Sequence, residues 1–252
     1  MMNWGRIEPL LDSKMFLADA VALRERASKA GYLFFRELVE PAAILQLRKR
    51  VLEICRKLGW LTEGLPLMEG VARAGIRVGA HDGPIWPAFQ CEVLVLAEFV
   101  QLGLRPEILG VLEALFLEPV LPHRGETCRA FSPGAFDLTT LPHQDHYYVR
   151  GATDLWTVWI PLGNCPVPLG GLAVLPGSHL QGLMFHAGEK SGEQGVHVSE
   201  SATWFTTDYV CGDVLMFNSL TVHRACPNTT SGRLRLSVDY RYEPSGHRSS
   251  RI

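Results

Sequence analysis

The stretch LPHQDHYYVR, residues 141–150, carries a histidine and an aspartate two positions apart. In an extended chain, side chains at i and i+2 leave the same face, so His143 and Asp145 can converge on one ion while Gln144 points away. With one more histidine from elsewhere they would form the two-histidine, one-carboxylate triad of non-haem Fe(II) sites, which leaves coordination positions open. Short His/Asp pairs also occur in solvated loops, so the assignment depends on finding a third ligand.

Other histidines of the chain compete for that role. We favour His223, because it follows a predicted turn and strand over 212–218 that would place it at the mouth of a barrel. His179 is the main competitor, but the segment Pro176-Gly177-Ser178-His179 is typical of a tight turn in which the imidazole caps the backbone. The remaining alternatives are His81, His123, His146, His186, His197 and His247.

A polar face runs along the segment RLRLSVDYR, residues 233–241. The strict alternation puts Arg233, Arg235, Ser237, Asp239 and Arg241 on one side of a strand, which must then face water or a polar cavity. A guanidinium near iron could grip a carboxylate with two parallel hydrogen bonds, and a hydroxyl two residues further could add another. Arg235 with Ser237 fits that pattern.

The rest of the chain divides into a helical half and a strand-rich half. Apolar spacing predicts helices over 16–30 and 41–58 and a helical stretch over 88–117 in which Pro106 opens a second segment, with a strand at 32–35 and a loop over 59–87. After that, short β-rich runs separated by Gly, Pro and Asn predict strands. These runs are 120–121, 127–131, 156–162, 172–175, 197–198, 213–217 and 234–242.

These elements predict one domain over residues 1–252, mainly β with flanking α-helices. A mostly helical buttress, 1–118, would support an antiparallel β-barrel or jelly roll over 119–242. The chain has 252 residues, 47% hydrophobic and 20% charged, which suits a globular protein with a substantial core.

Composition also excludes several function classes. The net charge is −2 without a long basic run, which argues against nucleic acid as the main partner. No apolar run reaches the roughly 18 residues of a membrane span and no signal peptide is evident, so we expect a cytoplasmic protein without a membrane partner. The cysteines lack CxxC pairing and are interpreted as buried thiols, not a zinc or disulfide framework. No Gly-x-Ser-x-Gly elbow, Walker loop or Rossmann fingerprint occurs.

At this point the motifs carry a family likeness. The ordered set His143-Gln144-Asp145, WIPL at 159–162, GLAVLPGSH at 171–179, His223 and Arg235-Leu236-Ser237 resembles the phytanoyl-CoA dioxygenase family of Fe(II)- and 2-oxoglutarate-dependent oxygenases. The resemblance covers about residues 120–242 well and the N-terminal segment more weakly. Each motif alone is common, whereas their order and spacing are specific.

The resemblance implies a double-stranded β-helix, a cupin-like jelly roll with an N-terminal helical layer. Iron would be bound by His143, Asp145 and His223. Arg235, helped by Ser237, would hold the distal carboxylate of 2-oxoglutarate. The resemblance extends the co-substrate pocket to Thr157, Trp159 and Arg129.

Several alternatives remain open within this likeness. Arg235 lies slightly farther from His223 than is usual in the family, so Arg233, on the same face, is an alternative anchor. His146 and Tyr148 either border the substrate pocket or pack at the barrel rim. Because Asp145 is present, where related halogenases carry a small residue, halogenation is disfavoured.

The expected reaction is hydroxylation, or another oxidation, of a small organic substrate with O2 as co-substrate and release of succinate and CO2. The alternatives are another cupin-like metalloenzyme, such as a hydrolase or isomerase, and a catalytically silent protein that binds metal or 2-oxoglutarate. Neither the substrate nor the oligomeric state can be deduced from the sequence, and the loops 59–87 and 183–204 are expected to shape the pocket.

Overall fold

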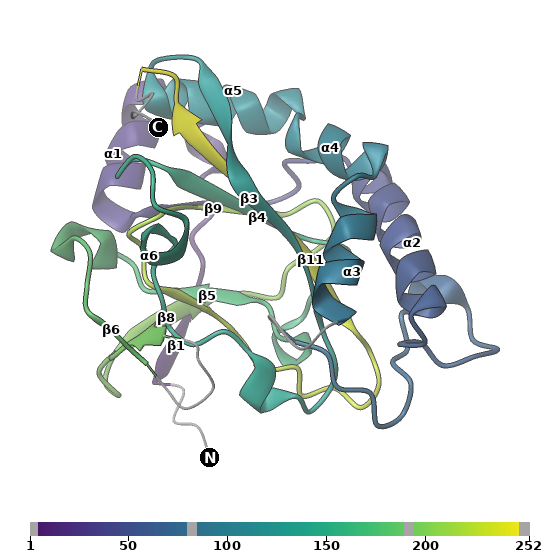
Figure 1. Ribbon diagram of the computed structural model, residues 1–252. Helices are drawn as coiled ribbons and strands as arrows, with labels where there is room; N and C mark the ends of the chain where they lie inside the picture. The colour runs from purple at the N-terminus through teal and green to yellow at the C-terminus, as the bar shows by residue number, and fades with distance from the viewer. Residues whose placement is uncertain (1–4, 80–84, 189–193, 247–252) are drawn as a thin grey trace.

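The chain folds into two facing β-sheets, and helices cover the outer face of the larger sheet (Figure 1). This computed structural model describes residues 5–79, 85–188 and 194–246. The predicted fold class, mainly β with flanking helices in a double-stranded β-helix, is confirmed.

The larger sheet has the strand order β2-β9-β4-β11-β3, and the smaller sheet has the order β1-β8-β5-β10. The strands of the larger sheet are β2 (Tyr32–Phe35), β9 (Val214–Asn218), β4 (Trp156–Pro161), β11 (Arg235–Pro244) and β3 (Val120–Phe131). Those of the smaller sheet are β1 (Arg6–Pro9), β8 (Thr203–Thr206), β5 (Leu172–Val174) and β10 (His223–Ala225), and a separate hairpin pairs β6 (His186–Gly188) with β7 (Gln194–Val196). These strand pairs are antiparallel except β1 with β8, which is parallel.

Among the described residues, five helices pack against the larger sheet and contribute buried side chains to one core cluster, whereas a sixth, short helix does not belong to that cluster. They are α1 (Ala20–Ala30), α2 (Pro41–Lys57), α3 (Ile85–Val93), α4 (Ala97–Gly103), α5 (Pro106–Phe116) and the short α6 (Asp145–Val149). Single 3-10 turns occur at Lys14–Phe16, Leu67–Glu69, Phe136–Leu138, Val167–Leu169 and Ser178–Gln181. Pro41 and Pro106 open α2 and α5, where a missing N–H costs nothing. Helix residues such as Leu47 and Leu112 form one buried cluster with Val158 of β4.

The central strand β11 separates two environments. Leu236, Val238 and Tyr240 belong to the core under the helices. The alternate residues of the strand therefore face the space between the two sheets. They are fully buried there and include Arg235 and Asp239. A continuous row of polar side chains inside a β-sandwich requires partners or a ligand, which locates the functional site.

Several predicted boundaries were wrong. The helix expected over 16–30 begins only at Ala20, because Asp19 caps it by accepting from Val21 N and Ala22 N. His197-Val198 is not a strand; β7 ends at Val196. The separate runs at 120–121 and 127–131 are one strand, β3. Strands β1, β6, β8 and β10 were not predicted, since each has only three or four residues and little alternation. Of the cysteines, Cys91 is exposed and Cys211 is half-buried, whereas the other four are buried as expected.

The lengths of the helices can be compared with the length that a membrane span requires. Among the described residues no single helix is long and apolar enough to cross a membrane. One bent pair, Trp86–Val93 with Ala97–Phe116, passes the same length and composition test together, with a 75° bend between its parts. Phe89, Phe99 and Leu112 of this pair lie in the core against the larger sheet.

The end of α1 supports the turn before β10, and this gives a stability prediction. Gly31 has φ +73, and its carbonyl accepts from Asn218 N and Thr221 Oγ1. A Cβ at this position would lie 2.6 Å from Thr221 Oγ1 and closer still to His179. We expect Gly31→Ala to lower the free energy of unfolding by more than about 1 kcal/mol, because strain and a clash act together. Urea unfolding measures the loss.

The matched control is Gly64→Ala. Gly64 has φ +77, yet nothing lies within 4 Å of a Cβ built there. The Gly64→Ala variant therefore has the backbone strain of an alanine at positive φ but no steric clash. Equal losses in the two variants would show that the contacts around Gly31 do not matter.

Candidate metal centre

Two segments, one carrying His143 and Asp145 and the other carrying His223, bring the three predicted ligands together. His143 and His223 form an isolated antiparallel bridge in which each backbone N donates to the other's carbonyl at 3.0 Å. Gln144 is extended (φ −113, ψ 128), as expected. Asp145, however, does not continue an extended chain but is the first residue of α6. The extended backbone at Gln144 therefore puts His143 and Asp145 on the same side, as predicted. The turn into α6 then directs the Asp145 carboxylate toward the histidines.

The three side chains offer a compact donor set. Their ligand atoms all lie within 4.8 Å of one another, and all three residues are buried. Asp145 Oδ1 is 3.6 Å from His143 Nε2 and 3.5 Å from His223 Nε2. Two imidazoles and one carboxylate at this spacing match the ligand set of a non-haem iron site.

Backbone contacts determine which ring nitrogens are available. His143 Nδ1 lies 2.7 Å from the carbonyl oxygen of Leu141, and His223 Nδ1 lies 3.0 Å from that of Thr221. A carbonyl can only accept, so each Nδ1 carries the proton and each Nε2 keeps its lone pair. Burial, aided by the neighbouring ring of His223, also lowers the pKa of His143, which favours the neutral form that binds metal.

Asp145 has strong partners on its other oxygen. Oδ2 accepts from Thr157 Oγ1 at 2.6 Å and from Arg241 Nε at 3.1 Å. Burial alone would raise the pKa of Asp145, but the positive charge of Arg241 holds that pKa well below its ordinary value. The aspartate is therefore a carboxylate at neutral pH.

Arg235 lies in the same pocket as the three ligands, and one of its guanidinium nitrogens has no acceptor among the described residues. It is 1% exposed, its Nε donates to the Gly170 carbonyl at 2.8 Å, and its Nη1 donates to Ser237 Oγ at 2.6 Å. Its guanidinium lies 4.1 Å from the centre of the Phe131 ring. Nη2 is buried without an acceptor among the described residues. Burial lowers the pKa of Arg235 to about 10, so the group stays charged at neutral pH and presents a donor to an anion.

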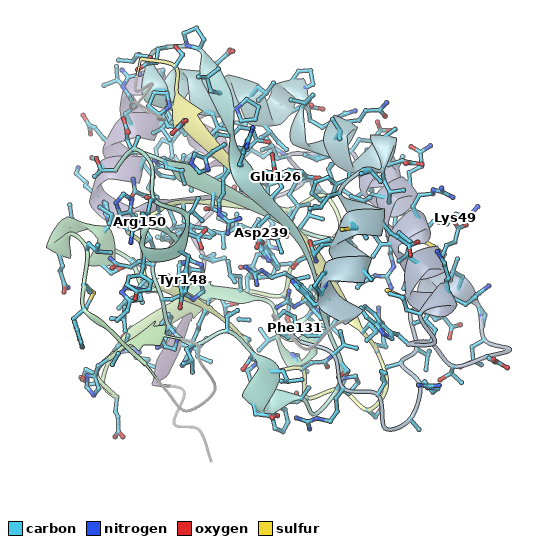
Figure 2. All side chains as sticks on the ribbon, viewed as in Figure 1. Lys49, Glu126, Phe131, Tyr148, Arg150 and Asp239 are labelled. Atoms are coloured by element: carbon cyan, nitrogen blue, oxygen red, sulfur yellow. The ribbon has the colours of Figure 1, made fainter. Side chains whose placement is uncertain are left out.

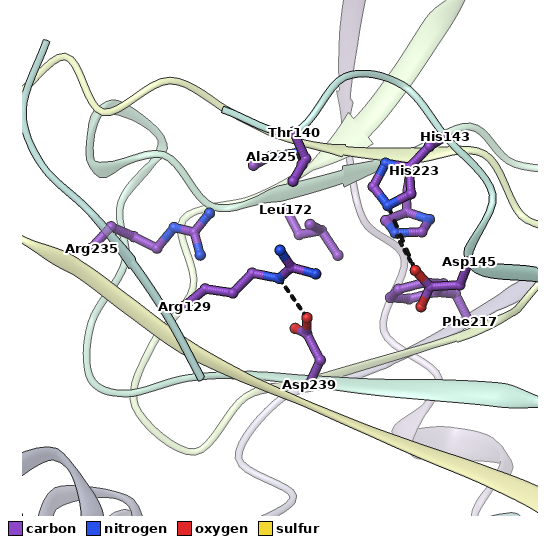
Figure 3. A pocket seen from close by; sticks show the side chains of 10 residues that line it. All are labelled: Arg129, Thr140, His143, Asp145, Leu172, Phe217, His223, Ala225, Arg235 and Asp239. Atoms are coloured by element: carbon purple, nitrogen blue, oxygen red, sulfur yellow. Dashed lines mark hydrogen bonds and ion pairs between the residues drawn. The ribbon is translucent and has the colours of Figure 1, made fainter. Parts of the chain in front are cut away.

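Figure 3 shows how the pocket is laid out. Arg235 lies at one end, and the cluster of His143, His223 and Asp145 lies at the other. Between them Arg129 Nε donates to Asp239 Oδ2 at 2.6 Å. The remaining lining residues are Thr140, Leu172, Phe217 and Ala225. A dicarboxylate spanning the pocket would therefore meet a metal site at one end and an arginine at the other.

The other predicted pocket residues are placed less directly. Trp159 lies in the core between the sheets, 4.8 Å from Tyr209 by ring centroids, and its buried Nε1 has no acceptor among the described residues. Trp156, of opposite parity, packs under the helices. Thr157 directs its hydroxyl to Asp145 and is not a lining residue.

His146 and Tyr148 belong to α6, and Figure 2 labels Tyr148. The Tyr148 ring is half exposed, and its centroid is 5.6 Å from that of His143 in an edge contact. His146 is half-buried, and its backbone N donates to the Ser219 carbonyl. Neither residue lines the pocket itself.

The competing residues lie elsewhere. His179 Nε2 is 3.0 Å from the Ser28 carbonyl, which agrees with the expected backbone contact. Arg233 precedes β11 and is exposed, unlike Arg235. His123, His186 and His197 are not part of the ligand cluster, and His81 and His247 lie outside the described residues.

Hydrogen bonds of Gln144 and His186 connect the segment that carries His143 and Asp145 to residues 182–188. The bond to His186 predicts that the stability of the protein depends on pH. His186 Nε2 accepts from Gln144 N at 3.1 Å, so the ring must be neutral, with Nδ1 donating to the Met184 carbonyl. Burial lowers the pKa of His186. As pH falls below the ordinary histidine pKa of about 6.5, the unfolded chain takes up a proton that the folded chain resists, so stability falls. We expect the midpoint of thermal unfolding of the metal-free protein to drop between about pH 7.5 and 5.5.

The comparison for this effect is His186→Gln, which does not titrate in that range. The drop should be smaller in the variant than in the wild type. A drop of the same size in both proteins would assign the effect to other groups.

Arg241 and Asp239 are site residues that were not among the predicted ones. Both belong to the alternating polar face of residues 233–241, so the available signal was the unbroken alternation. Their partners, Asp145 and Arg129, come from other segments. The alternation could therefore locate them on the inner face but could not assign contacts.

Fold and site together define a class of protein. A double-stranded β-helix with a buried His-Asp-His cluster and a buried arginine in the same pocket is the architecture of non-haem Fe(II)- and 2-oxoglutarate-dependent oxygenases. Residues 27–236 match the phytanoyl-CoA dioxygenase (PhyH) family, and the chain belongs to it. The predicted oxidoreductase activity with iron, 2-oxoglutarate and O2, acting on a small molecule, is confirmed at this level.

The chain also resembles individual enzymes. It is 28% identical over 258 residues to 1-deoxypentalenic acid 11-beta-hydroxylase of Streptomyces exfoliatus, covering 94% of this chain and 86% of that one. The enzyme of the same name from Streptomyces arenae is 28% identical over 268 residues, covering 98% and 87%. The structure of the epimerase SnoN in complex with Fe3+, alpha ketoglutarate and nogalamycin RO has a TM-score of 0.62 at 20% identity, over 93% of this chain and 88% of that one. At that identity the structural likeness establishes the fold.

Proposed function

We propose that this chain hydroxylates a carbon of a small organic molecule and that His143, Asp145 and His223 bind the Fe(II) that it uses. The observation that carries the proposal is one pocket with the three ligand atoms at one end and the unpartnered Nη2 of Arg235 at the other. The donor set fits iron because two neutral nitrogens and one carboxylate leave the cation with residual positive charge.

In this proposal 2-oxoglutarate is held at the Arg235 end. Arg235 and Ser237 bind its distal carboxylate, and the buried Nε1 of Trp159 offers a further donor on the same side of the sheet. Arg129 lies between the two ends and adds positive charge, which Asp239 partly offsets. A buried dianion would be compensated here by fixed donors, as the cost of burying charge requires.

His143, Asp145 and His223 would hold the iron, which would supply O2 activation coupled to the oxidative decarboxylation of 2-oxoglutarate to succinate and CO2, with one oxygen atom of O2 going to the substrate carbon as a hydroxyl and the other to succinate. The side chains around it act by binding and orientation. Burial of the ligands excludes water, and the backbone carbonyls of Leu141 and Thr221 keep both imidazoles in the metal-binding tautomer.

We infer a largely apolar substrate that enters on the side of α6. The half-exposed Tyr148 lies beside His143 there, and Tyr147 stacks on His186 at 4.2 Å. Leu183 and Phe185, on the segment that contains His186, are exposed. The similar enzymes named 1-deoxypentalenic acid 11-beta-hydroxylase support a small organic acid as the substrate. A single domain over residues 1–252 and a cytoplasmic location remain predictions.

The test is a metal-dependent turnover assay. Apo protein is loaded with Fe(II), supplied with 2-oxoglutarate, ascorbate and O2, and succinate is measured with a panel of apolar carboxylic acids and polycyclic compounds. Succinate release that requires iron and rises with a substrate supports the proposal. Iron and 2-oxoglutarate binding without turnover across the panel would favour a silent binding protein, and activity with zinc or manganese alone would favour another metalloenzyme.

A further inference from the structure

The two oxygens of the Asp145 carboxylate lie in different surroundings. Oδ1 is the oxygen that lies near Nε2 of His143 and His223. Oδ2 accepts two hydrogen bonds from the protein, one from Thr157 Oγ1 at 2.6 Å and one from Arg241 Nε at 3.1 Å, and Arg241 Nη2 lies 3.0 Å from it as an ion pair. The side of the carboxylate away from the histidines is thus held by a hydroxyl and a guanidinium.

Three strands hold the donors in place. Thr157 of β4 and Arg241 of β11 are directly paired across the sheet. The Nη1 of Arg241 donates to the Gly125 carbonyl of β3, next to a register shift between β3 and β11. Thr157 and Arg241 are 1% and 4% exposed. Asp145 comes from a different segment, at the start of α6, so a rigid sheet fixes the rotation of a carboxylate that belongs to a short helix.

Arg241 is committed to Asp145 rather than to its other acidic neighbour. Asp239 Oδ2 is 4.0 Å from Arg241 Nη2, and it lies 2.6 Å from Arg129 Nε. Each aspartate on this side of the sheet thus has its own arginine. Arg241 therefore neutralises the charge of Asp145, and the separate Arg129–Asp239 ion pair lies in the middle of the pocket.

We propose that Arg241 and Thr157 are positioning residues that keep Asp145 a one-oxygen ligand of iron; the inference rests on the proposed function. Two imidazoles and one carboxylate oxygen occupy three of about six positions, and 2-oxoglutarate and O2 need the other three. If both oxygens of Asp145 turned to the metal, one co-substrate position would be lost. The two hydrogen bonds to Oδ2 and the ion pair with Arg241 Nη2 oppose that rotation. This assigns the Thr157 hydroxyl to Asp145 instead of to 2-oxoglutarate.

The test uses substitutions that preserve shape. Thr157→Val removes the hydroxyl with little change in volume, Thr157→Ser keeps it, and Arg241→Lys keeps the charge but loses the fork. Removing a partner of a metal ligand commonly costs about 10- to 100-fold in metal affinity. We expect weakening of that order for Mn(II) in Thr157→Val and Arg241→Lys, measured by electron paramagnetic resonance, and near wild-type affinity in Thr157→Ser. The charge-transfer absorption of the anaerobic Fe(II) and 2-oxoglutarate complex should shift in the same two variants.

A matched control separates positioning from general stability. Arg36 Nη1 contacts buried Asp213 at 2.6 Å, at the end of β9 away from the site. Arg36→Lys should lower the melting temperature without changing Mn(II) affinity or the absorption spectrum. Wild-type affinity and spectrum in folded Thr157→Val and Arg241→Lys would overturn the inference. If Asp145→Ala also left Mn(II) binding unchanged, the metal site and with it the proposed function would be wrong.

Discussion

Replacing Asp145 with alanine is expected to reduce iron-dependent succinate formation to background. The substitution removes the only carboxylate of the ligand cluster and leaves two neutral imidazoles, which bind Fe(II) weakly. It also leaves Arg241 buried without its closest counter-charge, for which a stability loss on the order of 3–5 kcal/mol is typical. Circular dichroism at low temperature must therefore accompany the assay, so that lost activity is measured on folded protein.

A pair of histidine variants supplies the control for this result. His223→Ala should abolish Mn(II) binding and succinate formation in the same way, because it removes another member of the cluster. His179→Ala changes the same residue type in the turn that contacts the Ser28 carbonyl, and it should retain turnover. Activity retained in His223→Ala but lost in His179→Ala would mean that the metal binds elsewhere.

The second large effect is expected at the opposite end of the pocket. Arg235→Leu should raise the KM for 2-oxoglutarate, because it removes a buried guanidinium whose Nη2 has no acceptor among the described residues. Truncating one partner of a buried, hydrogen-bonded charge pair costs about 2–5 kcal/mol, which corresponds to roughly 30-fold or more in affinity. Mn(II) affinity should stay close to wild type, since Arg235 does not contact the ligand cluster. Steady-state kinetics at saturating substrate give the KM.

Arg233→Leu is the matched control. Arg233 has the same side chain two residues earlier but is exposed and precedes β11. It should leave the KM for 2-oxoglutarate unchanged. A larger effect of Arg233→Leu than of Arg235→Leu would mean that Arg233, not Arg235, binds the distal carboxylate of 2-oxoglutarate.

Local patterns account for much of what could be predicted. The i and i+2 spacing of His143 and Asp145 and the alternation through residues 233–241 depend only on backbone geometry, so they were readable without coordinates. The long helix α2, opened by Pro41, and the buried strand β2 follow from equally local rules. Very short strands such as β1 and β8 were not readable, because their pairing depends on distant neighbours rather than on their own composition.

The amino-acid sequence by itself determined the fold class, the polar face of residues 233–241 and the residue types available to bind a metal and a carboxylate. The tertiary structure alone decided which of these side chains meet. It brought His223 next to His143 through a single bridge, exposed Arg233 while burying Arg235, and directed Arg241 and Thr157 to one oxygen of Asp145. The physical reason is range: periodicity fixes the side of a strand on which a residue lies, whereas contacts between segments many residues apart depend on how the two sheets pack.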